Sequence, residues 1–120
     1  MILTVHQKFA LALIVLGLAG AAWCFIDLRR QGKVSGGVQA FLILAWALVL
    51  VQDLLGLLLL AQGHRPANFL LHVMYGILNA VVLPVAWGLS ARGSDRQEAI
   101  YLGLGSLLFG LFSFRALAVA

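Results

Sequence analysis

The sequence predicts an all-α integral membrane protein, an antiparallel up-down bundle of four transmembrane helices in one domain over residues 1–120. Composition is the first reason, because 63% of the 120 residues are hydrophobic and only 10% are charged, with a mean hydropathy of +1.06. Soluble domains are about half apolar and about a quarter charged. The excess of apolar side chains therefore has to face lipid.

The positions of the charged residues divide the chain into four apolar runs. We expect helices at about 7–28, 36–62, 66–91 and 98–118. Each run is close to the roughly 20 residues that cross the hydrocarbon core of a bilayer. The strands of a membrane barrel would be about half as long and would alternate apolar with polar residues. The joints between the runs are short, which favours antiparallel neighbours.

The charge of these joints predicts the orientation. The first and third joints and their flanks hold five of the eight basic residues: Arg29, Arg30, Lys33, Arg92 and Arg96. Basic residues accumulate in cytoplasmic loops. We therefore expect a multi-pass protein of the cell membrane with both termini outside. The first helix is not expected to be a cleaved signal peptide, because its basic cluster follows the apolar run.

The composition and the motifs of the sequence exclude several function classes. The net charge of +4 is mostly a topology signal, so we expect the lipid bilayer, and no nucleic acid, as a partner. The single cysteine, Cys24, allows no internal disulfide, no thiolate metal cage and no c-type haem attachment. Phosphate-binding loops, nucleophile elbows and His-Glu-x-x-His motifs are missing. We therefore predict no catalytic residue and expect a binding or electron-transfer protein rather than an enzyme.

Small residues and prolines predict how the helices meet. On the first helix Gly17 and Ala21 form a small-xxx-small pair, which permits close backbone approach. A similar stripe on the fourth helix consists of Gly103, Ser106, Gly110 and Ser113. Pro84 deprives the Ala80 carbonyl of its intrahelical donor, so we expect a kink there. Pro66 fits the first turn of the third helix.

Polar residues within the spans should gather in the half of the bundle that holds both termini. Antiparallel pairing places there His6, Gln52, Asp53, His72 and Arg115, together with His64 of the joining loop. Such residues are costly in lipid and usually face the bundle interior. Asp53 is the only membrane-embedded acid, and we expect it to be buried and partnered with Arg115 or Tyr75.

The third helix carries the clearest functional face. His72, Tyr75, Gly76 and Asn79 follow an i, i+3, i+4, i+7 pattern. This pattern aligns an imidazole, a phenol, a gap and an amide, and Gly76 leaves room for a flat ligand or a neighbouring helix. The alternative interpretation is an interior polar stripe that hydrogen-bonds other helices.

Haem ligation is the sharper interpretation, because a neutral imidazole is a common axial ligand of haem iron. The first and third helices of such a bundle are diagonal, roughly 12–14 Å apart when neighbours are about 8–10 Å apart. His6 and His72 lie on these helices at similar depth, so we expect both to ligate the iron of one haem b. Arg65 and Arg115 lie at the rim, where they could pair with the propionates. The expected cofactor-binding residues are His6, Arg65, His72, Tyr75, Gly76, Asn79 and Arg115.

The same residues carry a resemblance. His6, the stretch Leu71-His72-Val73-Met74-Tyr75-Gly76 and the closing Arg115-Ala116-Leu117-Ala118 resemble small four-helix membrane haem proteins, and one four-helix half of the haem A synthase type. The resemblance covers the layout of the whole chain and implies a haem-binding, cytochrome b-like bundle. It does not extend to the synthase reaction, and Phe114 stands where a histidine would have been informative.

The expected role is electron transfer, haem handling or that of an accessory subunit of a membrane complex. Two other classes stay open: a small proton-coupled transporter, in which Asp53 relays protons, and a cofactor-free structural subunit of a larger assembly. Small multidrug transporters match this chain in size only, since their essential glutamate lies in helix 1, where Asp27 is the first acid. A metal site built from His6, His64 and Asp53 is a further alternative. Other membrane subunits or a homo-oligomer are possible partners.

Overall fold

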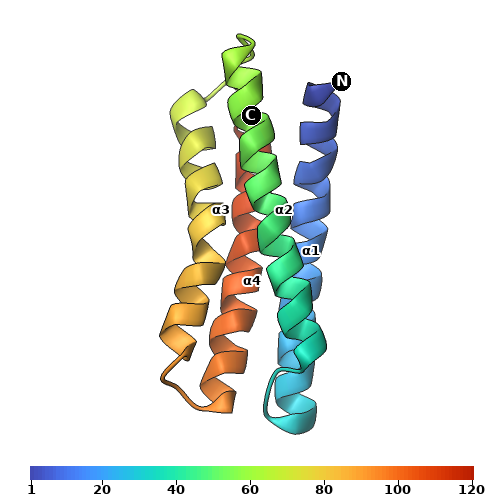
Figure 1. The fold of residues 1–120 in the computed structure, drawn as a ribbon, viewed down its shortest axis with the longest axis vertical. Coiled ribbons are helices and arrows are strands. Elements are labelled where there is room, and N and C mark those ends of the chain that lie inside the picture. The colour runs from blue at the N-terminus through green and yellow to red at the C-terminus, as the bar shows by residue number, and fades with distance from the viewer.

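A computed structural model describes all 120 residues and contains four α-helices: α1 (Ile2–Gln31), α2 (Gly36–Ala61), α3 (Phe69–Ser90) and α4 (Asp95–Ala118). They run alternately up and down (Figure 1). One end of the bundle, here called the termini end, holds both chain ends and residues 62–68 (Figure 1). The other, here called the basic end, holds residues 32–35 and 91–94. The all-α up-down bundle is thus confirmed.

Every helix is long and apolar enough to cross a membrane. The bundle measures 48 Å along its longest axis, slightly more than the roughly 40–45 Å of a bilayer with its headgroups. Only 25 of 120 residues are buried, and large apolar side chains such as Val15, Leu57 and Leu70 are more than half exposed. Because water would penalise such a surface, lipid is the solvent that suits it. The chain therefore has the features of a multi-pass membrane protein.

The helices are arranged so that α1 and α3 are diagonal. Each of these two helices packs against both α2 and α4. This arrangement, expected for an up-down bundle, lets side chains from α1 and α3 face one another across the centre.

Capping residues set the helix ends and explain where they differ from the expected ones. The Asn68 side chain accepts a hydrogen bond from the Leu71 N–H, and α3 begins only at Phe69. Pro66 therefore precedes the helix, and its expected place in the first turn is wrong. Ser94 and Gln97 form a capping box that starts α4 at Asp95, earlier than expected.

The predicted small residues bring α1 and α4 together. Gly17 lies so close to α4 that a Cβ atom there would be 2.5 Å from the Gly110 nitrogen. The Ser106 hydroxyl donates a hydrogen bond of 2.8 Å to the Gly17 carbonyl. The small residues of both predicted stripes are buried, namely Gly17, Ala21, Gly103, Ser106, Gly110 and Ser113. The close approach of α1 and α4 at Gly17 thus depends on these small residues.

Pro84 lies inside α3, which continues through it to Ser90. The Trp46 indole on α2 donates a hydrogen bond of 2.9 Å to the Ala80 carbonyl, the group that Pro84 leaves without a donor. A second indole, that of Trp87, donates to the Gln39 side chain at 3.3 Å. These two contacts join α2 and α3 from the middle of the bundle toward the basic end.

Candidate ligand cavity at the termini end

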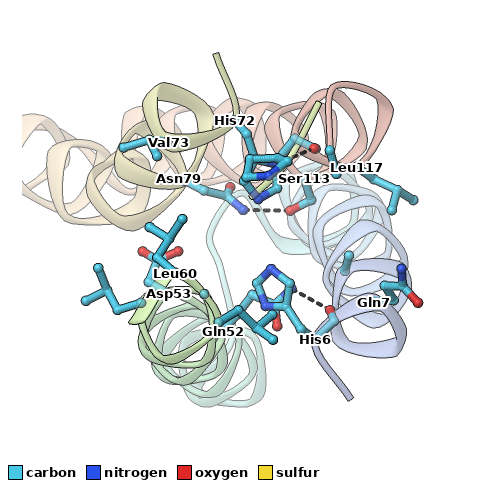
Figure 2. Close-up of a pocket in the computed structure, with 18 of the residues that line it drawn as sticks. His6, Gln7, Gln52, Asp53, Leu60, His72, Val73, Asn79, Ser113 and Leu117 are labelled. Carbon is cyan, nitrogen blue, oxygen red and sulfur yellow. Dashed lines mark hydrogen bonds between the residues drawn. The ribbon is translucent and has the colours of Figure 1, made fainter. Parts of the chain in front are cut away.

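A cavity of about 590 Å³ opens in the termini half of the bundle. Its volume falls within the roughly 300–1,000 Å³ of small-molecule sites. All four helices contribute polar residues to it, namely His6 from α1, Gln52 and Asp53 from α2, His72 and Asn79 from α3, and Ser113 from α4 (Figure 2). Small residues also line it: Gly56, Gly76, Ala116 and, just after α4, Ala120. The cavity thus brings together His6, Gln52, Asp53 and His72, which were expected in this half, while Asp27 is buried at the basic end.

Two histidines face one another across the cavity (Figure 2). The ring centroids of His6 and His72 are 6.1 Å apart, and the ring planes are inclined at 68°. Metal–imidazole bonds are about 2.0–2.1 Å long, so two imidazoles on opposite sides of one metal ion have ring centres roughly 6 Å apart. The two rings are therefore at the separation that a single metal centre between them requires.

The tautomer of His72 follows from its partner. Its Nδ1 lies 2.7 Å from the Ala116 carbonyl oxygen on α4. Because a carbonyl oxygen can only accept, Nδ1 carries the proton, and Nε2 of the neutral ring keeps a lone pair. Metal-binding histidines commonly donate their second ring N–H to a carbonyl in this way. His72 is thus oriented as a ligand would be.

His6 is held through its backbone rather than its ring. The Gln52 side-chain amide donates a hydrogen bond of 2.7 Å to the His6 carbonyl oxygen. The ring Nδ1 is buried and has no hydrogen-bond partner. Gly56 allows the ring to approach α2, since a Cβ atom at that position would be 3.3 Å from the His6 Cε1 atom. The ring is therefore packed but still free to bind.

The floor of the cavity contains two further buried atoms without partners. These are Oε1 of Gln52 and Oδ1 of Asn79, whose side chains are 7% and 3% exposed. Together with His6 Nδ1 they are the only buried side-chain polar atoms in the protein that lack a hydrogen bond. Buried polar groups are normally satisfied. Their concentration in one cavity indicates that it is built to receive a polar group.

Most of the predicted site residues line this cavity, but Tyr75 and Arg115 do not. The lining includes His6, Gln52, Asp53, Arg65, His72, Gly76 and Asn79. The Tyr75 ring instead packs against Phe112 at 6.1 Å between centroids. The Arg115 guanidinium carbon lies 5.9 Å from the centre of the Tyr75 ring. Both side chains thus belong to a contact between α3 and α4 beside the cavity.

The predicted partner of Asp53 is wrong. Asp53 is half-buried and forms neither an ion pair nor a hydrogen bond with Arg115 or Tyr75. It faces Gly76 instead, where a Cβ atom would be 3.4 Å from its Oδ1 atom. Tyr75 and Gly76 are consecutive and so point about 100° apart on a helix of 3.6 residues per turn. Only one of them can face α2, and it is the glycine.

No group of three or more histidine, cysteine or acidic side chains is placed to hold a bare metal ion. The alternative set of His6, His64 and Asp53 is therefore not assembled. His64 is exposed in the segment between α2 and α3 and reaches only the rim of the cavity. The histidine pair thus suits a metal whose remaining ligands come from a bound cofactor rather than from the protein.

Three residues that line the cavity, Ser113, Gly56 and Ala116, were not predicted as site residues from the sequence. Ser113 lines the cavity as well as belonging to the predicted packing stripe. Gly56 and Ala116 form small walls beside the histidines. Gly56 follows Gln52 by one helical turn, so the two residues lie on the same face of α2. This spacing is the sequence signal from which Gly56 could have been predicted as a cavity residue.

Comparison of the chain with protein-family models, with curated proteins and with solved structures gives no match.

Proposed function

We propose that the protein binds one haem b in this cavity, with His6 and His72 as the axial ligands. The observation that carries the proposal is the pair of imidazoles on diagonal helices, 6.1 Å apart, of which His72 already donates its Nδ1 proton to Ala116. Haem iron accepts neutral imidazoles, and the partnerless ring nitrogen of His6 supports the same assignment.

The walls beside the histidine pair favour a flat ligand. The histidines project from α1 and α3, so a planar group between them extends toward α2 and α4. On these two sides the lining includes the small residues Gly56, Ser113, Ala116 and Ala120. Leucines such as Leu60 and Leu117 also line these sides and would supply apolar contacts to a macrocycle.

The rim supplies one cationic side chain for the propionates. Arg65 lines the cavity and is exposed, with its guanidinium carbon 5.1 Å from the centre of the Phe69 ring. Arginine binds carboxylates through paired hydrogen bonds. Arg65 is therefore the residue we assign to this role, while Arg115 is directed to Tyr75 instead.

We also propose that the termini end faces the outside of the cell membrane, because five of the eight basic residues lie near the basic end. Bound haem would supply one-electron redox chemistry. A single haem near one face suits electron exchange at that face, haem handling, or the role of an accessory subunit in a larger membrane complex. The residues of the chain bind and orient the group, and no catalytic residue is assigned.

A haem titration tests the proposal. Haemin added to the purified protein in detergent should bind saturably at one per chain, with a low-spin Soret band and sharp α and β bands after reduction. His64→Ala should bind equally well, because His64 lies at the rim. A titration without a saturable spectral change would contradict the haem proposal.

A further inference from the structure

The floor of the cavity is not explained by haem. It consists of Gln52, Asp53, Asn79 and Ser113, which line the cavity from α2, α3 and α4. Asn79 is seven residues beyond His72 along α3, or roughly 10 Å deeper in the bundle at about 1.5 Å per residue. The edges of a haem carry apolar groups or propionates, and neither donates a hydrogen bond to an amide oxygen. Haem therefore leaves the acceptors of the floor without a donor.

The orientation of Gln52 leaves an acceptor open. Its amide nitrogen donates to the His6 carbonyl at 2.7 Å. Because that carbonyl cannot donate, the amide cannot be turned round without losing the bond. Its Oε1 atom is consequently the atom that remains buried without a partner.

The orientation of the Asn79 amide is likewise fixed, in this case by a chain of hydrogen bonds. The Ser113 hydroxyl gives its only proton to the Phe109 carbonyl at 2.8 Å. The hydroxyl oxygen must therefore accept from Asn79, whose Nδ2 lies 2.7 Å away. The Oδ1 atom of Asn79 is left as a second open acceptor.

Asp53 adds a negative charge to these acceptors. Its carboxylate lies on the same wall as Gln52 and forms no ion pair. Arg65 is the only lysine or arginine in the cavity lining, and it lies at the exposed rim against Phe69. The floor thus offers two amide oxygens and a carboxylate, with no cationic side chain among them.

We infer that the floor of the cavity binds a protonated amino group, the head of a primary ammonium ligand. Such a head carries three N–H donors and one positive charge, which match the open oxygens of Gln52 and Asn79 and the charge of Asp53. The apolar part of the ligand would extend from the floor toward the termini end, where Leu60 and Val73 line the cavity. This inference does not rest on haem binding, since it concerns residues below the histidine pair.

Three ligands of similar size separate the contributions of charge and donors. Butylammonium has both, butyltrimethylammonium keeps the charge without an N–H, and 1-butanol keeps one donor without the charge. Calorimetric titration of the haem-free protein in a non-ionic detergent should show butylammonium binding at least about tenfold more tightly than the other two, since hydrogen bonds involving charged groups are among the strongest. Equal binding of butylammonium and butyltrimethylammonium would overturn the inference, as would equal competition by sodium, which donates no hydrogen bond.

Matched variants locate the site. Asp53→Asn and Gln52→Met should each weaken butylammonium binding about tenfold or more. Asp95→Asn, at the exposed start of α4, and Gln39→Met, toward the basic end, should leave it unchanged. His72→Ala should replace the low-spin haem spectrum with a high-spin one yet retain butylammonium binding, so the two proposals can fail separately. If circular dichroism shows that Gln52→Met is unfolded, Asp53→Asn decides, and unchanged binding to Asp53→Asn would contradict the inference.

Discussion

The Trp46 indole on α2 donates a hydrogen bond of 2.9 Å to the main-chain oxygen of Ala80 on α3. Ala80 is four residues before Pro84, so its carbonyl is the one that the proline ring nitrogen cannot serve. An indole from a neighbouring helix thus replaces the missing backbone donor. In lipid no water can do so, which gives the contact its importance for the packing of α2 on α3.

Trp46→Phe should therefore lower the free energy of unfolding by about 1 kcal/mol, the usual size of an interhelical hydrogen bond in membrane proteins. In a Pro84→Ala background the same substitution should cost less, because the alanine that replaces the proline supplies an N–H to the Ala80 carbonyl. Unfolding by sodium dodecyl sulfate, followed by circular dichroism, measures both values. Trp23→Phe is the size control, since Trp23 packs edge to face on Phe41. An identical cost of Trp46→Phe in both backgrounds would contradict the proposed replacement.

Gly17→Ala should destabilise the bundle by about 1–3 kcal/mol, the cost of inserting a methyl group into a packed contact. The added Cβ atom would lie 2.5 Å from the Gly110 backbone nitrogen, which cannot move without shifting α4. Gly88→Ala is the matched control in α3, where nothing lies within 4 Å of an added Cβ atom. This control should be stabilising by about 0.5–1 kcal/mol, because alanine favours a helix interior over glycine. Equal stabilities of the two variants in detergent would show that α1 and α4 do not meet at Gly17.

The orientation can be tested with two exposed glutamines at opposite ends of the bundle. Gln31 ends α1 at the basic end, and Gln62 follows α2 at the termini end. In a Cys24→Ala background, Gln62→Cys should react with an impermeant maleimide added to intact cells. Gln31→Cys should react only after the membrane is permeabilised. The reverse pattern would place the cavity on the cytoplasmic side.

Much of the bundle could be predicted because charge placement alone delimits the spans. The uncharged run before Asp27 and the one after Ser35 require two helices, and the short joint between them requires antiparallel packing. The α1–α4 contact could also be predicted, because glycines such as Gly17 and Gly110 have few roles in a membrane helix other than to let another helix approach closely. The exact helix ends were harder to predict, since they depend on capping residues such as Asn68.

The depth of the candidate site along the bundle could be predicted from the sequence, but the directions in which its side chains point could not. Spacing placed Tyr75 and Gly76 on one face, yet a face about 100° wide does not say which edge meets the cavity. The rotation of α3 is set by packing against its neighbours, and it turns Tyr75 toward Phe112. The Trp46 contact and the open oxygens of Gln52 and Asn79 likewise depend on how helices are rotated, which no single-helix pattern contains.

The spin state of bound ferric haem is the most direct measure of ligation by the histidine pair. Electron paramagnetic resonance of the haem-loaded protein should give a low-spin signal, because two imidazoles are available. His72→Ala and His6→Ala should each give a high-spin signal that free imidazole converts back to low spin, whereas His64→Ala should match the unaltered protein. A low-spin signal that survives both His72→Ala and His6→Ala would contradict haem ligation by this pair.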